Sequence, residues 1–158
     1  MINPSQPVRG WLLFFVVWMF INIIIGIGMN LLETAAVWNE QPGLRTAMFV
    51  CLLLSLAWYL SYAWFLILLL RHKARAVKYI KFMLLGTPVF IAIMPCVFSW
   101  LAHVTINASF SEVLKLLYTP AQWGNMAGTL TVSLLWYWYF CVSRRVAIIK
   151  NEDIPRVF

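Results

Sequence analysis

The sequence predicts an all-α integral membrane protein with four transmembrane helices, both termini on the cytoplasmic side, and a short amphipathic interfacial helix before the last span. Two observations carry this prediction. Four long apolar segments fill most of the 158 residues, and ten of the twelve Lys and Arg residues fall on alternate connections between them. A bilayer favours both features, because its core excludes charge and its cytoplasmic face retains Lys and Arg.

Each apolar segment is long enough to cross the hydrocarbon core, which needs about 20 helical residues at roughly 1.5 Å each. The predicted spans are residues 11–32, 47–70, 82–101 and 123–142. None contains Asp, Glu, Lys or Arg, and each is apolar around the whole helix except for scattered small or amide residues. A soluble bundle would leave each helix a polar face, so residues 1–158 are predicted to form one transmembrane domain in lipid.

The basic residues set the predicted orientation, because short Lys- and Arg-rich connections resist translocation. The ten on the predicted cytoplasmic side are Arg9, Arg71, Lys73, Arg75, Lys78, Lys81, Arg144, Arg145, Lys150 and Arg156. The opposite connections hold Arg45 and Lys115 with three glutamates. The formal charge of +7 is therefore explained by topology, and nucleic-acid binding gains no support from it.

Part of this basic set is expected to contact anionic lipid headgroups, at about 1 kcal/mol for each residue near the surface. The predicted contacts are Arg71, Lys73, Arg75, Lys78, Lys81 and Arg144. A specific lipid or partner site there is the alternative.

No catalytic, cofactor or metal site is predicted. Cys51, Cys96 and Cys141 lie singly in three spans, which argues against a thiol oxidoreductase and favours inert thiols packed among apolar side chains. His72 and His103 fall at opposite ends of the bilayer, about 30 Å apart, so one haem cannot join them. We expect His103 to make an interfacial hydrogen bond.

Proton-coupled transport usually requires an ionisable group at mid-membrane depth, and the predicted spans have none. Glu33 comes nearest. Because it follows the apolar pair Leu31 and Leu32, we expect it at the outer interface, solvated or weakly paired with Arg45.

Two helices carry small and amide residues at spacings that favour helix packing. In the first span Asn22, Gly26 and Asn30 recur every four residues and are predicted to face the bundle interior. In the fourth span Gly124 and Gly128 have the GxxxG spacing of closely packed helices, with Asn125 and Thr129 one position on. A substrate path lined by these polar groups is the alternative interpretation.

Pro88 and Pro95 predict a bend in the third span, or a hinge or cavity beside it. Beyond that span, Ser109 and Glu112 have capping-box spacing and predict an amphipathic helix over about residues 110–118, lying in the headgroup layer or against the bundle mouth. Thr119 and Pro120 predict the cap and first turn of the last helix.

Most of the nine tryptophans fall near predicted helix ends, as interfacial aromatic belts do. These are Trp11, Trp38, Trp100, Trp123, Trp136 and Trp138. Trp58, Tyr59 and Tyr62 lie deeper in the second span, where a tyrosine hydroxyl needs a partner, so they are the aromatic residues to examine for a pocket.

The end of the fourth span resembles the closing motif of the bacterial membrane family called domain of unknown function 2569. The matching residues are Trp136, Tyr139, Ser143, Arg145 and Val146, and Gly10, Trp11 and Leu12 resemble its usual opening. The resemblance implies a four-span protein of the bacterial inner membrane and supplies no activity. Physically, the motif is typical of a cytoplasmic anchor, with Arg145 also able to dock a partner or an anionic lipid.

These features favour a non-enzymatic accessory or scaffold subunit of a larger inner-membrane assembly, bound to a membrane-protein partner and to lipids. The connections are too short to build an extramembrane domain, so a partner surface must lie mostly on the helices. The alternative is a small homo-oligomeric transporter or lipid-handling protein, with Asn22, Asn30, Asn125 and Thr129 lining its path.

Overall fold

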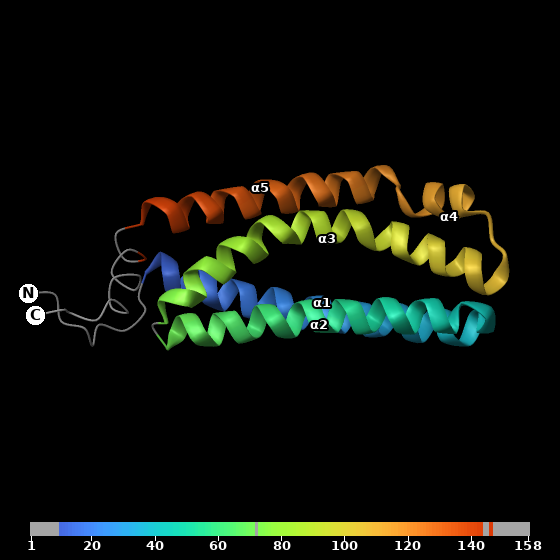
Figure 1. The fold of residues 1–158 in the computed structure, drawn as a ribbon, viewed down its shortest axis with the longest axis horizontal. Coiled ribbons are helices and arrows are strands. Elements are labelled where there is room, and N and C mark those ends of the chain that lie inside the picture. The colour runs from blue at the N-terminus through green and yellow to red at the C-terminus, as the bar shows by residue number, and fades with distance from the viewer. Residues whose placement is uncertain (1–9, 72, 144–145, 147–158) are drawn as a thin grey trace, which may run out of the picture.

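The computed structural model describes residues 10–71, 73–143 and 146, and these residues are almost entirely helical. The elements in chain order are α1 (Trp11–Glu40), the 3₁₀ turn η1 (Pro42–Leu44), α2 (Arg45–Leu70), α3 (Ala74–Ile106), α4 (Phe110–Leu117) and α5 (Pro120–Val142). The four long helices run in alternating directions along one axis (Figure 1). Residues Arg9, His72, Arg144, Arg145, Lys150 and Arg156 lie outside the described part.

Three helices, α1, α2 and α3, are long and apolar enough to cross a membrane. Helix α5 is less apolar than these three because it combines Gln122 and Asn125 near one end with a run of Trp and Tyr near the other. Such amphipathic aromatic residues favour the headgroup layer over the hydrocarbon core. The structure therefore gives a multi-pass membrane protein with at least three helices of spanning length and composition.

Helices α1 and α3 are longer than the apolar segments inside them. They have 30 and 33 residues, which at 1.5 Å per residue is about 45 Å and 50 Å. The hydrocarbon core is only about 30 Å thick, so both helices are long enough to continue into a headgroup layer. The extensions, residues 33–40 and 74–81, contain Ala, Glu and Lys, which stabilise a helix in a polar layer as well as in an apolar one.

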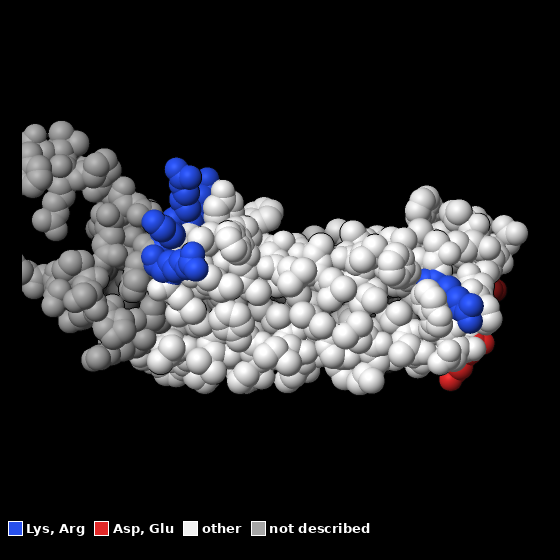
Figure 2. Space-filling model, turned by 90° about the horizontal axis from the view of Figure 1, so that it is seen from below, with Lys and Arg blue, Asp and Glu red and all other residues white. Residues whose placement is uncertain are grey.

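The described charges lie at the two ends of the molecule. Figure 2 shows Lys and Arg gathered at one end, Asp and Glu with further basic residues at the other, and an uncharged flank between them. Lys78 and Lys81 lie at the first end, which we call the proximal end because α1 starts there. The opposite, distal end holds η1 and α4, together with Glu33 and Arg45.

An aromatic cluster joins α5 to α1 near the proximal end. The Phe15 ring is fully buried, and its centroid lies 4.7 Å from that of Trp136 and 4.9 Å from that of Phe140. Trp136 also meets Tyr139 edge to face at 5.7 Å. Edge-to-face and tilted ring pairs add about 0.5–1.5 kcal/mol beyond their buried area, so this cluster is a strong point of attachment for α5.

Helices α1 and α2 are in tight contact at Gly26. A Cβ atom placed on Gly26 would lie 2.5 Å from the Tyr59 hydroxyl oxygen and 2.6 Å from its ring carbon Cζ. Gly86 plays the same part between α3 and α2, since its Cβ would lie 2.8 Å from the Trp58 ring, and that ring stacks on Phe90 at 4.7 Å. Because glycine has no side chain, these two positions let α1 and α3 approach α2 closely.

Helix α3 contains Pro88 and Pro95 and forms an arch in Figure 1, as the two prolines predict. It ends at Asn107, whose φ of 53° is left-handed and turns the chain toward α4. His103 Nδ1 lies 2.8 Å from the Ala108 carbonyl oxygen and secures this turn, so the expected hydrogen bond of His103 is confirmed.

Gly26→Ala is expected to lower the stability of the folded protein by about 1–3 kcal/mol, the usual cost of overpacking a tight contact. The new methyl group must displace the Tyr59 ring. Gly28→Ala is the matched control on the same helix, because nothing lies within 4 Å of its added Cβ. Reversible unfolding in mixed micelles measures both, and equal stability of the two variants would contradict the close approach of α1 and α2.

Candidate functional site

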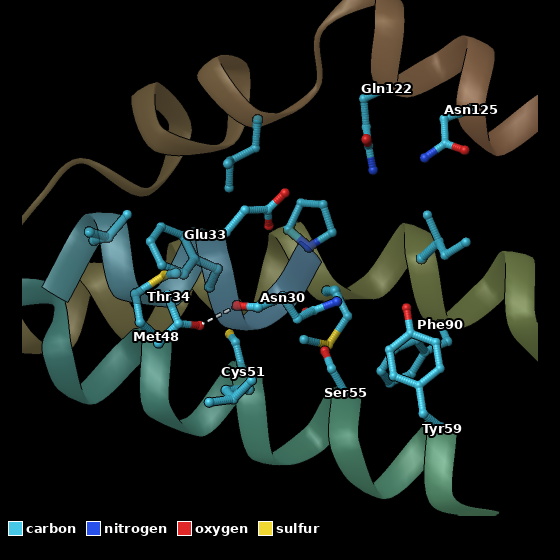
Figure 3. Close-up of a pocket in the computed structure, with 17 residues that line it drawn as sticks. Asn30, Glu33, Thr34, Met48, Cys51, Ser55, Tyr59, Phe90, Gln122 and Asn125 are labelled. Carbon is cyan, nitrogen blue, oxygen red and sulfur yellow. Dashed lines mark hydrogen bonds between the residues drawn. The ribbon is translucent and has the colours of Figure 1, made fainter. Parts of the chain in front are cut away.

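A cavity of about 520 Å³ lies in the distal half of the molecule, where α1 and α5 separate. Its walls come from α1, α2 and α3, and the end of α4 and the first turns of α5 cover it (Figure 3). The volume is typical of sites for drug-sized ligands, about 300–1,000 Å³. Its lining is mixed, with apolar side chains in the majority and polar groups from α1, α2 and α5.

Helix α1 supplies Asn30, Glu33 and Thr34 to the cavity. The Asn30 amide nitrogen donates to the Gly26 carbonyl at 2.8 Å, and the Thr34 hydroxyl donates to the Asn30 carbonyl at 2.7 Å. Both bonds run along α1 and hold these side chains against their own helix. The Asn30 side-chain oxygen and the Glu33 carboxylate accept no hydrogen bond from another residue drawn in Figure 3.

Helices α2 and α3 form the opposite wall. From α2 come Cys51, Ser55 and Tyr59, and from α3 come Phe90 and Met94, among other apolar side chains. Ser55 is buried and small, so it leaves room at the centre of this wall. The Tyr59 and Phe90 rings both line the cavity, Tyr59 from α2 and Phe90 from α3 (Figure 3). The site therefore presents an apolar, partly aromatic surface facing a polar one.

Side chains of α5 reach the cavity from its covering side. Gln122 and Asn125 point toward the space between α1 and α3 (Figure 3). The Thr119 side chain accepts from the Gln122 backbone nitrogen at 3.2 Å, and Pro120 occupies the first turn, so the start of α5 is as predicted. This cap fixes the point at which α5 begins and the direction in which Gln122 points.

Tyr118 fastens this cover to the bend of α3. Its hydroxyl donates to the Ala92 carbonyl and lies 3.6 Å from Cys96 Sγ, and its ring stacks on Trp123 at 5.3 Å. Ala92 precedes Pro95 by three residues and so lies in the turn before this proline. A residue between α4 and α5 thus bonds to α3 beside its bend.

Helix α4 packs against α3 at the bundle mouth, which is the second of the two placements expected for it. The predicted capping box does not form. Ser109 makes no side-chain cap and its hydroxyl lies 3.2 Å from the Ser111 hydroxyl, because a nearer hydroxyl competes for the bond. Leu117, at the end of α4, lines the cavity.

Glu33 does not pair with Arg45, although such a pair was one of the two expectations for this residue. The Arg45 Nε donates to the Trp38 carbonyl at 2.9 Å, and its guanidinium lies 5.4 Å from the centroid of the Trp38 ring. Glu33 is exposed at the rim of the cavity. Among the described residues that line this cavity, it is the one with a formal charge.

The predicted polar stripe of α1 is only partly directed inward. Gly26 contacts Tyr59 and Asn30 lines the cavity, but Asn22 is exposed, and its amide nitrogen donates to the Trp18 carbonyl at 2.8 Å. A bond to its own helix satisfies this amide donor without a neighbouring helix, so the prediction of an inward Asn22 is wrong.

The expectation for Gly124 and Gly128 is also wrong within this chain. Nothing lies within 4 Å of a Cβ added at either glycine, because α5 packs through the face that contains Ser133 and Phe140 instead. Thr129 is half-buried and does not line the cavity, and Asn125 does line it. Of the four residues suggested for a path, Asn30 and Asn125 therefore line the cavity, and Asn22 and Thr129 do not.

The family-like motif at the end of α5 packs inward more than an anchor would. Trp136 and Tyr139 belong to the aromatic cluster, and Val146 is 3% exposed. The Ser143 backbone nitrogen donates to the Tyr139 carbonyl at 2.9 Å, and the helix ends there. Trp138 is 65% exposed, and its interfacial position stays a prediction. Trp136 packs in the aromatic cluster, and its belt position likewise stays a prediction.

The basic cluster at the proximal end is exposed, apart from the half-buried Lys81. Lys81 Nζ lies 3.3 Å from Cys141 Sγ and 5.8 Å from the centroid of the Tyr137 ring. Cys141 is exposed next to a cation, so the expectation that all three thiols are packed among apolar side chains is wrong for Cys141. Arg71, Lys73, Arg75 and Lys78 have side chains free to reach a headgroup layer.

Several cavity residues were not among the predicted site residues, notably Glu33, Thr34, Ser55 and Gln122. A signal for the first two exists in the sequence, since residues 26, 30, 33, 34 and 37 occupy one face of α1. Ser55 and Gln122 give no such signal, because their role depends on where α2 and α5 are placed. Of the three aromatic residues of α2 that were to be examined for a pocket, Tyr59 lines the cavity and Trp58 and Tyr62 do not.

Among the described residues no group of three or more His, Cys, Asp or Glu side chains is arranged to hold a metal ion. The chain matches no protein family model, no curated protein and no solved structure. Functional inference therefore has to come from the cavity and from the surfaces of the helices.

Tyr118→Phe is expected to destabilise the cover by about 1 kcal/mol, because it removes one hydrogen bond and leaves the Ala92 carbonyl without that donor. Amide hydrogen exchange should accelerate in residues 110–123 and remain unchanged in α1. Tyr79→Phe, which alters an exposed tyrosine stacked on Phe65, is the control. Unchanged exchange in α4 would show that the hydroxyl does not fasten it.

Proposed function

We propose that this protein binds a small amphipathic molecule within the distal cavity, as a transporter component or a lipid-handling protein of the membrane. The observation that carries the proposal is the cavity itself. It has the volume of a ligand site and combines apolar walls with convergent polar groups, and these features together are typical of small-molecule sites.

The polar groups support this proposal beyond the volume. Amide side chains within a membrane bundle normally bond to another helix or to a ligand, because hydrocarbon offers no partner. Gln122 and Asn125 point into the cavity, and Figure 3 draws no hydrogen bond from either of them to another lining residue. A ligand with hydrogen-bonding groups, or water that accompanies it, would satisfy these amides.

The proposed setting is the bacterial inner membrane, with α5 as the fourth span and both termini cytoplasmic. The positive proximal end supports this orientation, because Lys and Arg accumulate on the cytoplasmic side. The cavity would then open toward the outer interface. The resemblance of the closing motif to domain of unknown function 2569 agrees with this setting and adds no activity.

A second candidate function is that of a non-enzymatic accessory or scaffold subunit, bound to a membrane-protein partner or to a second copy. One observation favours it, the open glycine face of α5. Gly124 and Gly128 have nothing within 4 Å of an added Cβ, so a helix of another chain can approach them closely. This candidate is compatible with ligand binding, because neither Gly124 nor Gly128 lines the cavity.

Ser55→Phe is expected to abolish binding at the cavity, since the ring would occupy the centre of the α2 wall. The probe is Nile red, an uncharged dye, titrated against detergent-purified protein and read as saturable fluorescence. Ser61→Phe is the matched control, because Ser61 is exposed elsewhere on α2 and bonds only along its own helix, to the Ala57 carbonyl.

Saturable binding at one site in the wild type and in Ser61→Phe, lost in Ser55→Phe, is the expected result. Asn125→Phe blocks the cavity from the opposite side and should also abolish it. The proposal fails if the wild type binds no dye saturably, or if all three variants bind it equally.

The accessory-subunit candidate predicts a stoichiometric partner that depends on the glycine face. Protein tagged and purified at native level in mild detergent should retain the partner, and Gly124→Leu should release it, because the leucine separates the helices. Gly28→Leu, at another open glycine, should not. Retention of the same partner by Gly124→Leu would remove this candidate.

A further inference from the structure

We infer that the ligand of the distal cavity is an organic cation, whose positive group pairs with the Glu33 carboxylate and whose apolar body lies between Tyr59, Phe90 and Met94. The inference rests on the proposed ligand-binding function and specifies the chemical class of the ligand. It is carried by the charge, the aromatic faces and the shape of the cavity lining.

The formal charge in the described cavity lining is negative. Glu33 lines the cavity, and neither Lys nor Arg is among the described residues that do so. Arg45, the nearest basic residue in sequence, is committed to the Trp38 carbonyl and ring. A carboxylate without a cationic partner at the rim of a cavity attracts a positive ligand, and the apolar walls of the cavity focus its field. An anionic ligand would be repelled for the same reason.

The hydrogen-bonding groups are compatible with this sign. Asn30, Gln122 and Asn125 line the cavity, and each carboxamide has an oxygen that can accept from an ammonium group as well as a nitrogen that donates. The Asn30 amide nitrogen is already used for the Gly26 carbonyl, which leaves its oxygen as the available group. The amides can therefore bind a cationic group, and the sign of the preferred charge is set by Glu33.

The aromatic rings supply the second kind of contact. Tyr59 and Phe90 line the cavity, and their ring faces offer a large apolar surface against which the body of the ligand can pack. Stacking of Phe90 on Trp58 at 4.7 Å and the tight contact of Tyr59 with Gly26 hold these two rings in place. Met94 adds an adaptable apolar contact for the body of the ligand.

The ammonium group could belong to a free amine or to the headgroup of a zwitterionic lipid such as phosphatidylethanolamine. A lipid would bring its phosphate next to Glu33, and the described cavity lining offers no Lys or Arg to neutralise that phosphate. A free organic cation therefore fits the lining better, although both share the recognition of a positive group by Glu33.

The test is equilibrium binding of tetraphenylphosphonium to the full chain in an uncharged detergent, by isothermal titration calorimetry. The wild type should bind one cation per chain. Glu33→Gln removes the charge with almost no change of shape and should weaken binding by about tenfold or more, the effect of losing one close charge pair. Glu112→Gln is the matched control, because Glu112 is on α4 outside the cavity lining and should leave the affinity unchanged.

Tetraphenylborate has the same shape and the opposite charge, so it should bind far more weakly than the cation to the wild type. Native mass spectrometry of the purified chain then separates the two sources. Phosphatidylethanolamine retained by the wild type and lost from Glu33→Gln would assign the cation to a lipid headgroup, and absence of such a lipid together with tetraphenylphosphonium binding would assign it to a free cation.

The inference is overturned if tetraphenylphosphonium does not bind the wild type, or if Glu33→Gln binds it as tightly. These results differ from a failure of the proposed function. Saturable Nile red binding that is lost in Ser55→Phe would keep the cavity as a ligand site while removing the preference for cations, whereas absence of both kinds of binding would remove both proposals.

Discussion

The contact between Gly26 of α1 and Tyr59 of α2 is the interaction on which the rest of this structure depends. A Cβ atom added to Gly26 would lie only 2.5 Å from the Tyr59 hydroxyl oxygen, so the two helices can pack this tightly only because residue 26 is a glycine. Asn30 then lies one turn beyond Gly26, beside Tyr59, and both line the cavity. Helix α5 follows a different path, since its aromatic cluster holds it to α1 near the proximal end and leaves the distal end open. The cavity is the space between the packed helices α1 and α2 on one side and the start of α5 on the other.

The bend of α3 closes that space on the far side. Pro95 lines the cavity, and the turn before it offers the Ala92 carbonyl to the Tyr118 hydroxyl. The cover formed by the end of α4 and the start of α5 is thus tied to the irregular part of α3. A bend in a membrane helix is tolerated where other parts of the protein pack against it, and here Tyr118, which bonds to α3 beside the bend, also belongs to the cover of the proposed ligand site.

The sequence predicts the helical architecture well, because long uncharged apolar runs leave lipid as the only suitable solvent, and the start of α5 at Thr119 and Pro120 follows from local capping chemistry. It predicts interior faces less well. Asn22, Gly26 and Asn30 form one stripe, yet Asn22 satisfies its amide donor on its own helix. Glycine spacing at Gly124 and Gly128 indicates that a close approach is sterically allowed, and it does not indicate from which chain the other helix comes. The cavity depends on the relative placement of α1 and α5, which no local pattern encodes.

An experimental structure of the full chain in lipid nanodiscs, at a resolution that shows side chains, would test the central claim most directly. The account predicts non-protein density between Glu33, Asn125 and the Tyr59 ring, with α1 and α5 separated at the distal end. A contradicting structure would show α5 packed directly against α1 along its length, with Asn30 bonded to Asn125 and no space left between them.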